Sequence, residues 1–180
     1  MLSPFVANRW RLEQLTVNYR TPSEIADVAD DVLAAIEPSL TAPRSVRSTG
    51  VPPRAARVKG GVIDDAVAKV VAEEAGAVGD GRTAVLAPER RVAALRERVL
   101  GAVAGEEGDV DLSAPVVVLP VTAAKGLEFD AVVVVEPAEL LAESPRGAND
   151  LYVALTRSTQ RLAVVHAAPL PAMLRRLEEG

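Results

Sequence analysis

Val132-Val133-Val134-Val135 and Val116-Val117-Val118-Leu119 are two uninterrupted runs of apolar, mostly β-branched residues. Such runs are typical of strands buried on both faces, as in a parallel sheet that helices cover on each side. Residues 83–87 and 162–165 are predicted to form further buried strands, residues 56–58 a short edge strand and residues 15–17 a strand near the start. These runs predict an α/β fold with a mostly parallel central sheet.

Helix signals alternate with these strands along the chain. Thr21 can act as an N-cap, Pro22 suits the first helical position, and Glu24 completes a capping box. Apolar residues then recur at helical spacing as far as Ile36, and Pro38 ends the helix. Further helices are predicted over residues 64–78, 88–100, 149–156 and 169–177. Alternating strands and helices indicate a three-layer α/β sandwich.

Composition excludes several classes of protein. The chain has 180 residues, enough for one domain with a substantial core, and no cysteine, which excludes disulfides and thiolate metal sites and fits a cytoplasmic protein. No apolar run approaches the length of a membrane span, so no membrane partner is expected. The single histidine, His166, excludes a His-rich metal centre and is interpreted as a strand-end side chain; no metal ligands are predicted.

Charge is distributed unevenly along the chain. The net charge is −5, whereas proteins that bind nucleic acid through phosphates usually carry a basic excess. Any nucleic-acid contact is therefore expected to be local or shared with another domain. Residues 44–59 form a basic segment with no acidic residue, which is either a solvated loop or a patch for a polyanion or an acidic partner; its basic residues are Arg44, Arg47, Arg54, Arg57 and Lys59.

Three short motifs carry charged residues at the expected junctions of strands and helices. They are Asn18-Tyr19-Arg20, Lys125-Gly126-Leu127-Glu128 and the stretch from Asn149 to Thr156-Arg157. The first two each follow a predicted strand, and ligands of such folds bind beyond the carboxyl ends of the strands. We therefore expect the first two motifs to meet at the carboxyl edge of the sheet.

In this order the three motifs resemble motifs IV, V and VI of the UvrD/Rep-like superfamily 1 helicases. The resemblance implies a RecA-like (P-loop NTPase-like) fold and covers only the second RecA-like domain of these motors, residues 15–180, with residues 1–14 as a lead-in. The chain contains no Gly-x-x-x-x-Gly-Lys-Ser/Thr loop and cannot build the usual phosphate cradle by itself.

The resemblance also implies roles for individual residues at an ATP site. Tyr19 would stack on adenine, Glu128 would contact the sugar, and Gly126 would allow a tight backbone path close to the ligand. Arg20 and Arg157 would reach the γ-phosphate, with Arg157 as an arginine finger. Taken alone, without the other motifs, Tyr19 is better interpreted as a core residue and Arg20 as a member of a surface ion pair.

Nucleic-acid contacts are expected in the second motif. Thr122 and Lys125 are the expected contacts, although Lys125 also suits a role in stabilising its loop. The family usually has Thr-x-His upstream of this lysine, and here Pro120 and Thr122 occupy those positions.

The implied function is that of the C-terminal motor domain of an ATP-dependent DNA helicase or translocase. The expected cofactor is ATP with Mg²⁺, whose metal ligands would come from an N-terminal RecA-like domain. The expected partners are that domain and single-stranded DNA or another nucleic acid. The short spacing between the first two motifs resembles the HelD branch, whose members act on RNA polymerase. A degenerate helicase domain that docks a protein without using ATP is a further alternative.

Overall fold

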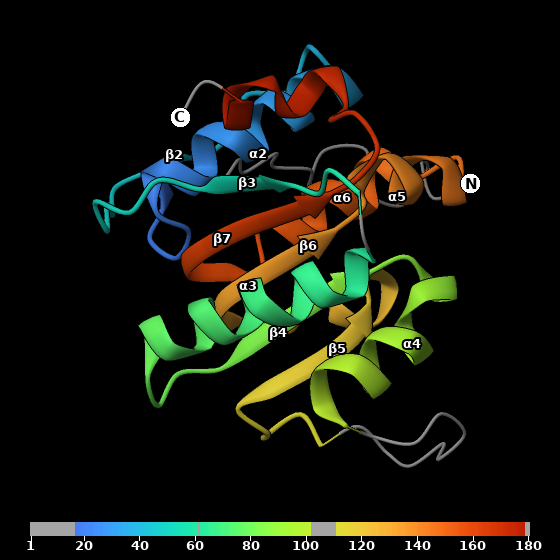
Figure 1. Cartoon of the computed structure of the whole chain (residues 1–180). Helices are drawn as coiled ribbons and strands as arrows, with labels where there is room; N and C mark the ends of the chain where they lie inside the picture. Colours follow the sequence, from blue (N-terminus) through green and yellow to red (C-terminus); the bar gives the residue numbers. More distant parts are fainter. Residues whose placement is uncertain (1–16, 61, 102–110, 179–180) are drawn as a thin grey trace, which may run out of the picture.

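A parallel sheet forms the centre of the molecule, as the apolar runs predict. The structure, a computed structural model, describes residues 17–60, 62–101 and 111–178. All four strand pairings of the central sheet are parallel, and the strand order is β3-β7-β6-β4-β5 (Figure 1). The strands are β3 (Arg54–Arg57), β4 (Thr83–Ala87), β5 (Val116–Pro120), β6 (Phe129–Val135) and β7 (Ser158–His166).

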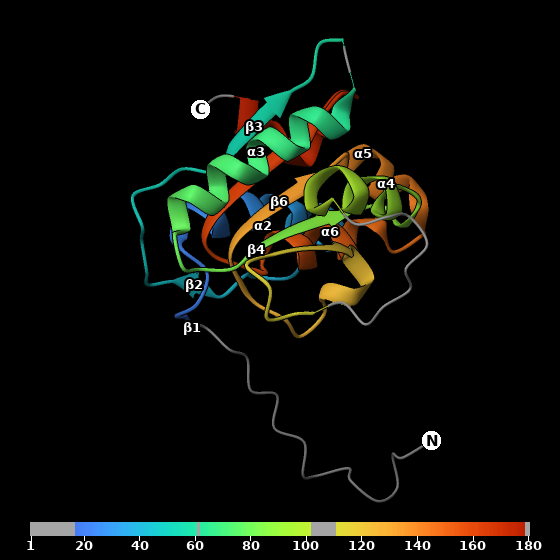
Figure 2. The same ribbon diagram turned by 60° about the horizontal axis from the view of Figure 1, so that its bottom comes forward.

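Helices cover both faces of this sheet. One face carries α2 (Ser23–Ile36), α6 (Gly147–Leu155) and the 3-10 segment η2 (Ala172–Glu178), and the other carries α3 (Ile63–Val78) and α4 (Glu89–Leu100) (Figures 1 and 2). Two shorter elements, η1 (Val121–Ala124) and α5 (Pro137–Glu143), flank β6 in the sequence. The prediction of a three-layer α/β sandwich is confirmed.

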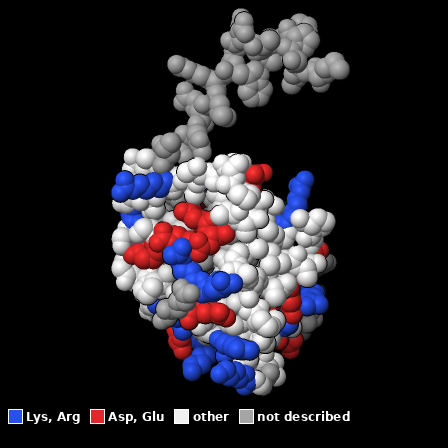
Figure 3. Space-filling model, turned by 90° about the horizontal axis from the view of Figure 1, so that it is seen from above, with Lys and Arg blue, Asp and Glu red and all other residues white. Residues whose placement is uncertain are grey.

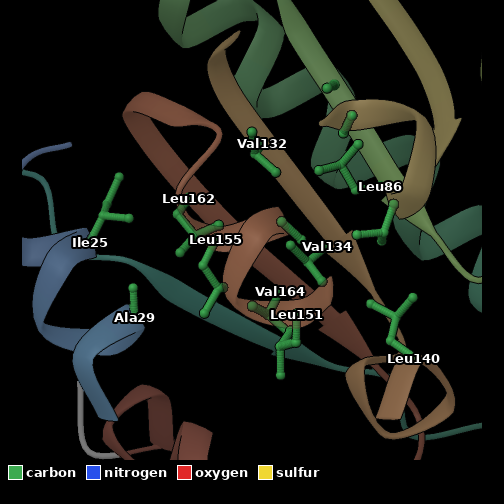
Figure 4. Packing of buried hydrophobic residues seen from close by; sticks show 14 of the residues in the cluster. Ile25, Ala29, Leu86, Val132, Val134, Leu140, Leu151, Leu155, Leu162 and Val164 are labelled. Atoms are coloured by element: carbon green, nitrogen blue, oxygen red, sulfur yellow. The ribbon is translucent and has the colours of Figure 1, made fainter. Parts of the chain in front are cut away.

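Alternating side chains of the central strands fill two separate cores. Val132 and Val134 of β6 belong to the core beneath α2 and α6, together with Leu151 and Leu155 of α6 and Ile25 of α2 (Figure 4). Val133 and Val135 of the same strand belong to the opposite core, with α3 and α4. Because both faces of β6 are fully buried, its unbroken valine run matches the pattern of a strand covered on each side.

A second, two-stranded parallel sheet lies outside the central one. It joins β1 (Val17–Asn18) to β2 (Arg44–Ser45). Residues 15 and 16 of the predicted first strand, and the lead-in over residues 1–14, lie outside the described residues. Residues 38–55 are rich in Pro, Ser and Arg, and this composition predicts an extended loop. The prediction is wrong at β2 and at the start of β3, because both strands pair with distant parts of the chain.

Two local predictions of helix structure are wrong. Helix α2 begins at Ser23 with Pro22 as its N-cap residue and has no side-chain cap, so Thr21 and Glu24 form no capping box. The Glu24 carboxylate instead accepts hydrogen bonds from residues 48–50. The closing helix predicted over residues 169–177 is the 3-10 segment η2. In the ranges that the structure describes, no helix is long and apolar enough to cross a membrane.

Candidate functional site

The motif residues converge at the amino ends of β6 and β7. Glu128 directly precedes β6 and Arg157 directly precedes β7, and the Phe129 N–H donates to the Arg157 carbonyl oxygen at 3.0 Å. The expectation that the first two motifs meet at the carboxyl edge is wrong. The chain leaves the carboxyl end of β5 through η1 and has returned to the opposite edge by Glu128, and β1 is not part of the central sheet.

Arg20 and Glu128 join the first motif to the second. The Arg20 Nη1 atom lies 2.9 Å from Glu128 Oε1, and the two side chains are 51% and 41% exposed. Arg20 therefore does belong to a surface ion pair, and its partner is the acidic residue of another motif. Tyr19 is 75% exposed, which excludes core packing for this side chain.

Arg157 lies half-buried directly after the last turn of α6. Its Nε donates to the Val153 carbonyl at 3.2 Å and its Nη1 to the Leu127 carbonyl at 3.2 Å. Its Nη2 donates to Thr156 Oγ1 at 3.4 Å. Arg157 makes no salt bridge to a carboxylate of a described residue, so its positive charge is solvated by neutral oxygens only.

The two guanidinium groups and Glu128 form a site with a positive excess. Burial lowers the pKa of the Arg157 guanidinium, the nearby positive charge of Arg20 lowers it further, and Glu128 opposes both effects. Arginine keeps its charge at neutral pH in spite of such shifts. One carboxylate thus faces two cations, and an anion placed between the arginines would relieve their repulsion.

A hollow of about 590 Å³ opens beside these residues. Its apolar walls come from Val17, Tyr19, Pro43 and Tyr152, and Arg20, Thr156 and Arg157 are among the residues of its polar side. The sequence prediction missed Tyr152 and Thr156 as site residues. Their spacing of four places them on one face of a helix next to Arg157, which is a signal that the sequence did contain.

The other predicted residues of the second motif lie apart from this hollow. Lys125 Nζ is 3.1 Å from Asp150 Oδ1 of α6, which fits the loop-stabilising role. Gly126 has φ +83°, a left-handed backbone that favours glycine, although a Cβ there would meet no atom within 4 Å. Thr122 is exposed in η1, beyond the carboxyl end of β5, so it lies at the other end of the sheet from Glu128.

The basic segment does not act as one free patch. Arg54 binds Glu73 and Glu74 of α3, and Arg47 donates to the Arg20 carbonyl at 3.4 Å. Arg44, Arg57 and Lys59 have no salt bridge to any described residue. Figure 3 shows side chains of both signs interleaved on one face of the molecule, in keeping with many local ion pairs.

Two further predictions concern metal and histidine. Among the described residues, no group of three or more His, Asp or Glu side chains is arranged to hold a metal ion. His166 is buried at the end of β7, where its Nδ1 lies 2.7 Å from the Ala168 carbonyl oxygen. This contact fits the interpretation of a strand-end side chain.

Known proteins resemble this chain in part of its sequence and in its fold. Residues 115–165 match the family model of the UvrD-like helicase C-terminal domain, and this segment includes Glu128 and Arg157. No curated protein matches the chain. The crystal structure of the C-terminal domain of a possible DNA helicase from Lactobacillus plantarum aligns with a TM-score of 0.63 and 22% identity, over 89% of this chain and 94% of that one. This likeness shows that the two domains share a fold.

A complex of arterivirus nonstructural protein 10, a helicase, with DNA aligns with a TM-score of 0.40 and 14% identity, over 93% of this chain and 29% of that one.

Proposed function

We propose that this chain is the C-terminal motor domain of an ATP-dependent superfamily 1 helicase or translocase and supplies half of an ATP site between two domains. The observation that carries the proposal is the meeting of Arg20, Glu128 and Arg157 beside the exposed ring of Tyr19. These residues come from three motifs, of which the first and the last lie more than a hundred residues apart in sequence. The fold brings them to one edge of the sheet.

The chemistry of these side chains suits a nucleoside triphosphate. The exposed face of Tyr19 offers a flat apolar surface for a base, and the carboxylate of Glu128 can accept hydrogen bonds from sugar hydroxyls. Arg20 and Arg157 carry fork-shaped donors that match phosphate oxygens. Bound ATP supplies the phosphoanhydride bond; the residues of this domain bind the base, orient the chain of phosphates and add positive charge at its end.

The remaining half of the site would come from an N-terminal RecA-like domain. That domain would contribute the phosphate loop, which this sequence lacks, and the ligands of Mg²⁺. Closure of the two domains on ATP, and opening after hydrolysis, would convert chemistry into motion along a nucleic acid. Thr122 and Lys125 are the candidate contacts to that nucleic acid, and they lie apart from the hollow beside Tyr19 and Arg157.

Nuclear magnetic resonance of the isotope-labelled 180-residue chain would test the half-site. ATP should shift the amide signals of residues 18–20, 128 and 157 with a Kd on the order of 1 mM, because only one side of the ligand is held. Adenosine, which carries the base and the sugar, should shift the signals near Tyr19 and Glu128, and inorganic tripolyphosphate those near Arg20 and Arg157. Unchanged signals at all of these positions, or shifts confined to another surface, would contradict the proposal.

The narrower alternatives differ in the macromolecule that is bound. A HelD-like factor would use the same ATP half-site and bind RNA polymerase, whereas a helicase or translocase would bind single-stranded DNA. A pull-down of RNA polymerase, compared with a DNA titration, separates these two. A protein-docking module without nucleotide would show no ATP-dependent shifts at Arg20 and Arg157.

A further inference from the structure

The side chains of Tyr19 and Arg20 do little to hold the backbone turn on which they lie. Tyr19 is 75% exposed and the Arg20 side chain 51%, so packing does little to fix either one. Asn18 closes the turn instead, because its Oδ1 accepts from the Arg20 N–H at 2.9 Å and from the Thr21 N–H at 3.1 Å. The directions of both functional side chains therefore depend on how this turn is held.

Residues 44–50, here named the strap segment, hold the turn from outside. The Val46 N–H donates to the Asn18 carbonyl at 3.1 Å, and the Ser23 N–H donates to the Arg47 carbonyl at 2.7 Å. Ser45 Oγ donates to the Thr21 carbonyl at 2.6 Å. The strap segment thus pairs with the backbone on both sides of Tyr19 and Arg20, and a shift of the strap segment would move the turn with it.

Glu24 in the first turn of α2 anchors the strap segment. Its carboxylate accepts from Ser48 Oγ at 2.5 Å, from the Gly50 N–H at 2.8 Å and from the Thr49 N–H at 3.4 Å. The hydrogen bond from Ser48 and the backbone N–H groups hold the pKa of this carboxyl at about 2, below its ordinary value of 4.5, against the opposing effect of burial. Glu24 is ionised at neutral pH, and its hydrogen bonds attach residues 48–50 of the strap segment to α2.

We propose that Glu24 and the strap segment are a positioning device that sets the direction of Arg20 toward the Glu128 carboxylate and toward an incoming phosphate. This inference rests on the proposed ATP half-site. It assigns a role to the first part of the basic segment, residues 44–50, whose serine, threonine and backbone groups matter more in this device than its positive charge. Glu24 contacts no ligand and acts through Arg20.

Two measurements on the full 180-residue chain test this role, one without ligand and one with it. The first follows the Nε–Hε signal of Arg20, which the ion pair with Glu128 should separate from the signals of free arginines. Glu24→Ala should move this signal to the free-arginine position, and Ser48→Ala should move it part of the way. Glu24→Gln keeps an acceptor oxygen and should leave the signal nearly in place.

The second measurement is calorimetric titration with inorganic tripolyphosphate. Removing a carboxylate near an anion should strengthen binding by charge alone. The positioning role predicts the opposite sign, a loss of roughly threefold or more for Glu24→Ala. Glu37→Ala is the matched control, since it removes a carboxylate at the far end of α2 whose hydrogen-bond partner among the described residues is Ser39, and it should not weaken binding.

The outcomes separate this inference from the function on which it rests. If tripolyphosphate binds, Arg20→Ala weakens the binding and Glu24→Ala strengthens it, then the half-site stands and the positioning role is wrong. If tripolyphosphate does not bind, the proposed function fails, and the Arg20 signal still decides the positioning role. Ser48→Ala serves in both measurements if Glu24→Ala does not fold, and an unchanged Arg20 signal in Ser48→Ala would then overturn the inference.

Discussion

Each of the two candidate phosphate-binding arginines has partners within the domain itself. Arg20 is paired with Glu128, and Arg157 donates to two carbonyl groups and a hydroxyl. A phosphate must compete with these partners, and it competes more easily with neutral oxygens than with a carboxylate. The two arginines should therefore respond differently to the same ligand.

Arg157 should matter most during the chemical step of the complete motor. A guanidinium beside the γ-phosphate acts on charge that develops in the transition state, so Arg157→Ala should lower kcat far more than it raises KM. Arginine fingers are worth roughly 10³ to 10⁵ in rate, so a loss of at least tens-fold is expected. Arg157→Lys should not restore the rate, because an ammonium group lacks the planar fork. Steady-state ATPase kinetics measures both constants.

Tyr19→Ala is the matching control for that experiment. Base stacking is the same in the ground and transition states, so this change should raise KM and affect kcat less. A wild-type kcat in Arg157→Ala together with a large loss of kcat in Tyr19→Ala would reverse the two assigned roles.

Glu128 should restrain Arg20 when the ligand has no sugar. Glu128→Gln removes the ion pair and one negative charge, so inorganic tripolyphosphate should bind severalfold more tightly, as measured by calorimetry. In an Arg20→Ala background the same substitution should give a much smaller gain, since the restrained group is absent. An equal gain in both backgrounds would mean that Glu128 acts only through long-range charge.

Sequence patterns predict these residues as members of one site, but they do not predict the surroundings of that site. The motif residues Tyr19, Arg20, Glu128 and Arg157 do lie at one edge of the sheet. The edge itself was predicted wrongly, because the path of η1 between β5 and β6 depends on tertiary packing that a local pattern does not contain. The pairing of Arg20 with Glu128 joins residues that are distant in sequence, so no local sequence pattern predicts it.

At the scale of elements, a buried acidic residue connects helix α3 to two strands. Glu74 is 1% exposed and binds Arg54 of β3 at 2.8 Å and Arg161 of β7 at 2.6 Å. Glu74→Ala would leave both arginines without this partner and should lower the free energy of unfolding by about 3 kcal/mol in urea denaturation. The control Glu73→Ala removes an exposed partner of Arg54 and should cost less than about 1 kcal/mol. Equal effects of the two substitutions would contradict the role of Glu74.

A second ion pair connects α4 to α5 and should make stability depend on pH. Hydrogen bonds from Arg91 at 2.6 and 2.7 Å, with a smaller contribution from Arg90, hold the pKa of the Glu139 carboxyl at about 2, below its ordinary value of 4.5. Because the folded-state pKa is the lower one, the stabilisation is present above 4.5 and is lost as pH falls from 4.5 toward 2.

Glu139→Gln should show this dependence directly. The variant should unfold with roughly 1–2 kcal/mol less free energy than the wild type at neutral pH, and the difference should vanish near about pH 2. Chemical denaturation at a series of pH values measures it. A difference that stays constant over this range would show that the carboxylate charge contributes nothing.

The sequence predicts the elements that have strong apolar patterns. It does not predict features that depend on which of several hydrogen-bond partners a group takes, or on pairing between very short strands. The buried strands β4, β5 and β6 follow from their apolar runs. The capping box at Thr21 and Glu24 does not form, because the Glu24 carboxylate accepts from Ser48 and Gly50 and the Thr21 N–H donates to Asn18 Oδ1 instead. The two-residue strands β1 and β2 have too little sequence of their own to carry any periodicity.

At the scale of the whole molecule, the described domain has a continuous core on each face of its sheet. The 180-residue chain should therefore unfold cooperatively on heating in plain buffer, without ligand or metal, as circular dichroism would show. The same sample should not hydrolyse ATP, because its sequence has no phosphate loop. Turnover that Arg157→Ala abolishes would contradict the half-site model, and a random-coil spectrum would contradict autonomous folding.

The position of β7 between β3 and β6 has a consequence for the order of assembly during synthesis. Arg54 of β3 pairs with Ala163 of β7, so β3 leaves the ribosome long before its partner among the described strands has been synthesised. Helix α3 and the strands β4, β5 and β6 can assemble first, but β3 must wait until β7 has been synthesised. Contacts across such long separations close slowly and expose unpaired strand edges in the meantime. The nascent domain is thus most vulnerable to misassociation just before β7 emerges from the ribosome.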